Sequence, residues 1–175
     1  MTGVQTCALP IYEISLALIE FHITHPKIEL SPFMNDELVV IASIQSCLRS
    51  KNEASIEEMT NFPLILREEG SGTRHIMEET LNSLNVKVDS FPSHLVLGSN
   101  QAIKVAVQSG LGISILSQSA VAKECEYGML HSLRIIGKNI ERYFYLATLK
   151  GVNMDLLAKL FTEMLKTNKG KNYTR

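Results

Sequence analysis

The sequence predicts an α/β fold built on an open, mostly parallel sheet, and two observations carry this prediction. After Phe62, strand-like apolar runs alternate with helical patterns, which is the order of strands joined by crossover helices. Glycine together with serine, threonine or asparagine stands where the first two of these strands end and their helices begin, and serine alone stands at the end of the third. The 175 residues, 45% of them hydrophobic, suffice for one domain or two small lobes.

The first part of the chain predicts a foreign leader followed by two buried strands. Residues 1–11, MTGVQTCALPI, fit neither helical nor strand periodicity, and we interpret them as a non-native leader. Residues 14–19, ISLALI, and 37–42, ELVVIA, are nearly continuous apolar runs, which are typical of strands buried on both faces. Pro26 and Pro32 interrupt the segment between the runs, so we expect a connector there.

The middle of the chain contains three rounds of strand, turn and helix. The expected strands are residues 62–66, 95–97 and 112–116. The first helix follows residue 74, the second ends near Gly110, and the third is capped by Ser117 or Ser119 and ends at Gly128. One buried stripe identifies the first helix, with apolar spacing at Ile76, Met77, Thr80, Leu81 and Leu84.

The last part of the chain predicts a β-hairpin and a final helix. Residues 130–136 and 143–149 are extended in pattern and flank a Gly-Lys-Asn turn, so we expect them to pair at an antiparallel edge. From about Asn153 a helix presents one apolar stripe, and residues 169–175 form a polar tail.

Charge and cysteine content exclude several classes of function. The net charge of -1, from 17 basic and 18 acidic residues, indicates no basic patch that would bind a nucleic-acid backbone. The three cysteines are widely spaced, which indicates no disulfide framework and a reducing cytoplasm. The five histidines lack metal-ligand spacing, so we expect no bound metal and no cofactor. No run of about 18 apolar residues is present, so no membrane contact is expected.

Two loops are candidates for binding a ligand. Residues 70–74, GSGTR, and 98–100, GSN, join strands to helices at the sheet edge where open α/β proteins bind ligands. Free amides and the helix dipole make such helix starts suitable for anions, with Ser71, Thr73 and Ser99 as candidate contacts. The alternative is that these residues only cap helices and that Arg74 only pairs with Glu78.

Enzymatic function is not expected. The loops lack the Gly-Lys-Ser/Thr ending of a P-loop and the third glycine of a dinucleotide fingerprint. Ser71 has no nucleophile-elbow spacing, and no matched acid and base are recognisable, so no catalytic residue is assigned.

Four segments in order carry a resemblance to a family: PFMNDELVVIAS, FPLILREEGSGTR, LGSNQAIKVAVQSGLGISILS and RYFYLATLK. Over residues 12–167 the chain resembles the effector-binding domain of LysR-type transcription regulators, closest to regulators of carbon fixation and sulfur metabolism. The resemblance implies a two-lobed fold like that of type 2 periplasmic binding proteins, with a small effector held between lobes. Residues 33–150 would form a nearly complete second lobe, and residues 12–32 and 151–168 would be remnants of the first.

The resemblance also implies a set of ligand contacts and partners. In the second lobe these contacts fall on Ser71, Gly72, Thr73, Ser99 and Asn100, with Arg74 beside them in the same loop. Glu20 and Phe21 would line the cleft from the first lobe, although the family usually has a small residue near Phe21. The implied protein is a cytoplasmic homo-dimer or homo-tetramer that senses a small, anionic metabolite and contacts DNA through a helix-turn-helix domain missing here. A solute-binding protein of a transport system is the alternative.

Overall fold

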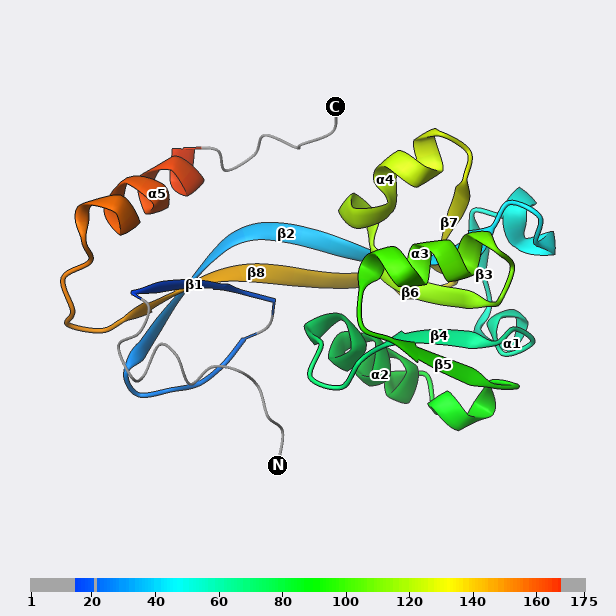
Figure 1. The fold of residues 1–175 in the computed structure, drawn as a ribbon. Helices are drawn as coiled ribbons and strands as arrows, with labels where there is room; N and C mark the ends of the chain where they lie inside the picture. Colours follow the sequence, from blue (N-terminus) through cyan, green and yellow to red (C-terminus); the bar gives the residue numbers. More distant parts are fainter. Residues whose placement is uncertain (1–14, 21, 168–175) are drawn as a thin grey trace. The chain divides into compact units, whose positions relative to one another are not determined.

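The computed structural model describes residues 15–20 and 22–167, and the chain divides into two compact units (Figure 1). Unit 1 consists of the described parts of Met1–Asp36 and Arg142–Arg175, and unit 2 of Glu37–Glu141. Both boundaries lie inside strands, within β2 (Ile28–Ser43) and β8 (Ile140–Leu149). These two strands therefore carry the chain from one unit to the other.

Unit 2 is built on a mixed sheet with helices on both faces. The central strands are in the order β2-β6-β4-β5, where β6 (Ile113–Ser117), β4 (Leu64–Arg67) and β5 (His94–Leu97) are parallel and β2 is antiparallel to β6. β7 (Leu130–Ile135) pairs with β2 and with β3 (Glu53–Ala54). The helices are α1 (Ile56–Met59), α2 (Gly72–Ser83), α3 (Asn100–Gln108) and α4 (Gln118–Glu126), with short 3-10 turns at Cys47–Ser50 and Val88–Ser90.

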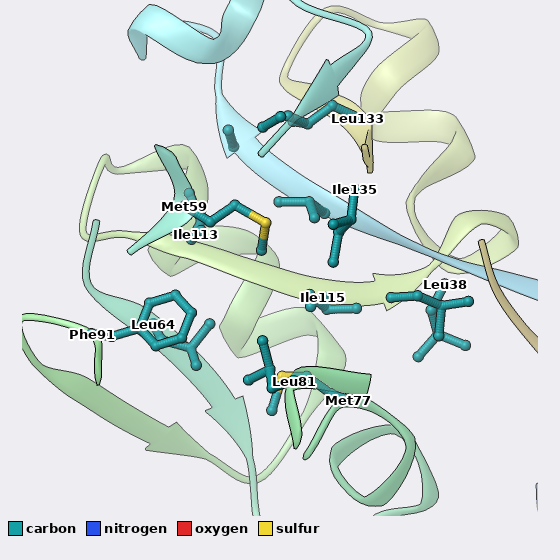
Figure 2. Close-up of a cluster of buried hydrophobic side chains, with 14 of the residues drawn as sticks. Leu38, Met59, Leu64, Met77, Leu81, Phe91, Ile113, Ile115, Leu133 and Ile135 are labelled. Atoms are coloured by element: carbon teal, nitrogen blue, oxygen red, sulfur yellow. The ribbon is translucent and has the colours of Figure 1, made fainter. Parts of the chain in front are cut away.

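Alternate residues of the central strands supply two separate cores. On the α2 face, strand residues such as Leu38, Leu64 and Ile115 pack with Met77 and Leu81 of the helix (Figure 2). On the other face a second cluster packs against α3 and α4, and comprises Val39, Ile41, Ile65, Ile103, Ala106, Val107, Leu116, Val121 and Leu130. Because both faces are covered, these strands are apolar at nearly every position, which explains the continuous runs in the sequence.

Unit 1 contains β1 (Leu16–Ile19), parts of β2 and β8, and α5 (Leu156–Thr167). β1 is antiparallel to β8, with Leu16 opposite Thr148. A small cluster of Ile28, Ala147 and Leu149 forms its core, with four partly buried apolar side chains packed around it. The expectation that β1 is buried on both faces is wrong for the described structure, because Leu18 is 47% exposed.

The expected connector is found at residues 22–27 but is wrong for residues 28–36, which form the first half of the long strand β2. The proline restricts Ser31 to extended backbone, but extended backbone is also strand geometry. Pro32 removes one ladder donor without ending the strand. The partial alternation of buried Ile28 and half-buried Leu30 with exposed Glu29 and Ser31 was the signal for a strand.

The expected hairpin near the C-terminus is also wrong. β7 and β8 follow each other in sequence, yet β7 pairs with β2 and β3, whereas β8 lies between β1 and β2. The 16 residues of β2 offer enough backbone for both segments to pair with it. The sheet is accordingly mixed, and the parallel arrangement predicted from the sequence holds for β4, β5 and β6 and for the short β3–β7 pair.

Candidate functional site

The candidate loops of unit 2 meet at one edge of the sheet. β4 and β5 are parallel and in register, with Arg67 opposite Leu97, so both strands end side by side. β6 is parallel to β4 on its other side and ends at Ser117. Each strand is followed directly by a helix, so the amino termini of α2, α3 and α4 gather at the carboxyl edge of the sheet (Figure 1).

The start of α2 lacks a side-chain cap. Gly70 adopts φ 87, a left-handed conformation that suits glycine, and turns the chain into the helix. Ser71 occupies the N-cap position in extended backbone, but its hydroxyl makes no capping hydrogen bond. The first helical bond runs from the His75 amide to the Ser71 carbonyl at 3.0 Å. The first turn of α2 therefore receives no capping bond from Ser71, and Gly72 and Thr73 are buried.

The starts of α3 and α4 are capped, in contrast to α2. The Ser99 hydroxyl accepts a hydrogen bond from the Ala102 amide at 3.2 Å. The Ser117 hydroxyl does the same for the Ala120 amide at 3.4 Å, so Ser117 is the cap of the two serines that the sequence offered. The capping interpretation is thus correct for Ser99 and does not describe Ser71. Ser99 is exposed and keeps a hydroxyl proton that it can donate elsewhere.

Arg67, which was not among the candidate residues predicted from the sequence, connects the two loops. Its Nη1 donates to Oδ1 of Asn100 at 2.7 Å, while Nε and Nη2 donate to the two carboxylate oxygens of Glu68 at 2.7 Å each. This bidentate bond lowers the pKa of Glu68. The signal in the sequence was a basic residue at the end of an otherwise apolar strand.

Arg74 is paired within its own helix and loop. Its Nε donates to Glu78 at 2.7 Å, the i,i+4 pairing considered as the alternative from the sequence. Its Nη1 also donates to the backbone carbonyl of Arg67 at 3.2 Å. Arg67 and Arg74 thus each have a carboxylate partner. The polar groups of these loops that could bind a ligand are therefore mainly amides and hydroxyls.

Glu20 belongs to a separate cluster in unit 1. Its Oε2 accepts from Nη1 of Arg142 at 2.9 Å, and Nε of Arg142 donates to Asp36 at 2.7 Å. The side chains of Arg142 and Asp36 are only 5% and 3% exposed, against 42% for Glu20. The available signal for this pair was two adjacent charged residues at the start of each apolar run, Asp36-Glu37 and Glu141-Arg142. Phe21 lies outside the described residues.

The structure therefore brings six of the eight predicted contacts to one edge of unit 2: Ser71, Gly72, Thr73, Arg74, Ser99 and Asn100. Across the described residues, no group of three histidine, cysteine, aspartate or glutamate side chains could hold a metal ion. In the same part of the chain, no helix has the length and apolarity needed to cross a membrane.

Comparison with known sequences identifies relatives over most of the chain. A profile described as LysR substrate binding domain matches residues 8–169. The HTH-type transcriptional activator CmpR of Synechocystis sp. PCC 6803 is 38% identical over 138 residues, which cover 79% of this chain and 44% of the relative. The HTH-type transcriptional regulator CysL of Bacillus subtilis is 31% identical over 156 residues, or 87% of this chain and 50% of the relative. The chain spans about half the length of these curated relatives.

A solved structure shares the fold. The regulatory domain of Synechocystis PCC6803 CcmR, in complex with 2-PG, superposes with a TM-score of 0.82 at 30% identity. The match covers 94% of this chain and 78% of that one. This similarity confirms the predicted fold class, the type 2 periplasmic-binding-protein-like α/β fold of effector-binding domains.

Proposed function

Because this chain belongs to the LysR substrate-binding domain family, we propose that it is the effector-sensing part of a LysR-type transcription regulator. The observation that carries the proposal is the start of α2, where Ser71 leaves the first amides of the helix without a side-chain cap. The two neighbouring helix starts are capped by their own serines. An effector group at α2 would supply the acceptor that Ser71 does not.

The effector is a small anionic metabolite. Amides of a helix start together with the positive end of the helix dipole favour a negatively charged group. The hydroxyls of Ser71 and Ser99 and the amide of Asn100 lie at the same sheet edge and add hydrogen-bond donors. Thr73 is 3% exposed, so it would contact only a group seated directly on the helix start. The complex of the related CcmR domain with 2-PG supports a small ligand.

The parent protein works as a cytoplasmic homo-oligomer, a dimer or tetramer, in which effector binding shifts the population between two arrangements. A separate helix-turn-helix domain makes the DNA contacts, as the names of the relatives indicate for those proteins. The present chain, by contrast, is a sensor domain without catalytic activity. Sequencing the source locus upstream of Tyr12 tests this assignment, because a helix-turn-helix supports it and a secretory signal would contradict it.

Calorimetric titration of the chain with 2-PG and with inorganic phosphate tests the site. Ser71→Ala removes one donor from the α2 start without removing a capping bond, and we expect it to weaken 2-PG binding about tenfold. Ser109→Ala is the matched control, since Ser109 lies at the other end of α3 and its hydroxyl donates to the Val105 carbonyl at 2.9 Å. Equal affinities for the two variants would refute the assigned site.

A further inference from the structure

We infer that Arg67 is a positioning residue that fixes the side chain of Asn100 with its Nδ2 group as a hydrogen-bond donor. The candidate site would therefore select effector groups that accept hydrogen bonds there, such as carboxylate or phosphoryl oxygens. This inference rests on the proposed function and deepens it, because it assigns a chemical class to the group that meets Asn100.

The chemistry of arginine fixes the orientation of the asparagine amide. A guanidinium has five donors and no acceptor, so the atom of Asn100 that lies 2.7 Å from Nη1 must be the oxygen. The Nδ2 group is then the other end of the same planar amide. A flipped amide would place two donors against each other and lose the bond.

Arg67 itself is held rigidly enough to impose this orientation. Nε and Nη2 make a bidentate bond to Glu68, and the side chain is only 19% exposed. Two parallel bonds between a guanidinium and a carboxylate fix the plane of both groups. The position of Asn100 as the first residue of α3 fixes its backbone, so the contact joins two anchored elements.

The Nδ2 group of Asn100 is available to a ligand. It makes no hydrogen bond to any residue that the structure describes, whereas Oδ1 is occupied by Arg67. Within the described residues, no buried side-chain nitrogen or oxygen lacks a partner, so this nitrogen is open to solvent. It stands at the amino terminus of α3, on the sheet edge that also carries the start of α2. A donor at this place matches an anion and opposes a cation.

The variant Asn100→Asp separates the two ends of the amide. The new carboxylate keeps an oxygen for Arg67 but replaces the donor with an acceptor, so we expect an unchanged or higher melting temperature and at least about tenfold weaker binding of 2-PG. Asn139→Asp is the matched control, because it makes the same charge change at an exposed site in another part of unit 2. Unchanged affinity in Asn100→Asp would overturn the donor role.

A measurement without ligand tests the positioning separately. In Asn100→Asp, the adjacent guanidinium should hold the carboxyl pKa, followed by carbon NMR, well below its ordinary value of about 3.9. Adding Arg67→Met should raise this pKa again. An equal pKa in both proteins would overturn the role of Arg67. If wild-type protein binds neither 2-PG nor phosphate, the proposed function is contradicted, while the pKa comparison still decides whether Arg67 faces this side chain.

Discussion

Removing the buried carboxylate of Asp36 should destabilise unit 1 far more than removing the exposed charge of Glu20. Both bond to Arg142, but Asp36 is 3% exposed and Glu20 is 42% exposed. Breaking a buried ion pair from one side costs about 3–5 kcal/mol. We expect Asp36→Ala to cost about 3 kcal/mol, at the lower end, because Arg142 retains Glu20. An exposed pair contributes about 1 kcal/mol or less, which is the loss expected for Glu20→Gln.

Urea unfolding measures these differences, with the near-ultraviolet circular dichroism of Tyr143 and Tyr145 in unit 1 as the signal. Their ring centroids lie 6.5 Å apart, in the same strand as Arg142. Replacing both buried partners together, in Asp36→Leu with Arg142→Met, should recover much of the lost stability, because no buried charge remains unpaired and Glu20 is partly exposed to solvent. Equal losses for Asp36→Ala and Glu20→Gln would refute the reasoning from burial.

Two further predictions concern unit 2. Gly112→Ala should lower the free energy of unfolding by about 2 kcal/mol or more, because its Cβ would lie 2.3 Å from the carbonyl oxygen of Pro63. Gly98→Ala, where a Cβ meets nothing within 4 Å, should change stability little in the same thermal melts. The Lys104 bond lowers the pKa of Glu124 below its ordinary 4.5, so this pair stabilises the fold above pH 4.5 and loses that contribution as the pH falls through the lowered value. The unfolding midpoint, measured at a series of pH values, should therefore fall less on acidification in Glu124→Gln than in the wild-type protein. Parallel pH profiles of the two proteins would contradict this.

The three strand-turn-helix rounds of unit 2 could be predicted because their signals are local. The buried stripe of α2 and the caps of α3 and α4 each depend on residues within a few positions of one another. Ser99 caps α3, which was the alternative to a ligand contact, and Ser117 caps α4, which was one of the two serines expected there. The same locality explains the two errors in strand assignment: Pro32 looked like a break, and the turn after β7 looked like the tip of a hairpin.

The candidate site was predictable at the level of loops but not of contacts. Glycine and hydroxyl residues between strand and helix identified the starts of α2 and α3. The bond from Arg67 to Asn100 joins residues 33 positions apart, and no pattern within either segment specifies it. It arises because β4 and β5 are parallel neighbours, which places the end of one strand beside the helix that follows the other.

The sequence alone determined the elements of the parallel layer and the loops at the sheet edge, because these depend on short-range periodicity and turn chemistry. Four matching segments in order carried the family resemblance. Tertiary structure alone decided which strands pair along β2 and which charges meet inside the protein. Asp36 and Arg142 are 106 positions apart, and only the course of β2 and β8 brings them together. A strand can take any compatible edge as its partner, so pairing is settled by the whole fold and not by the segment itself.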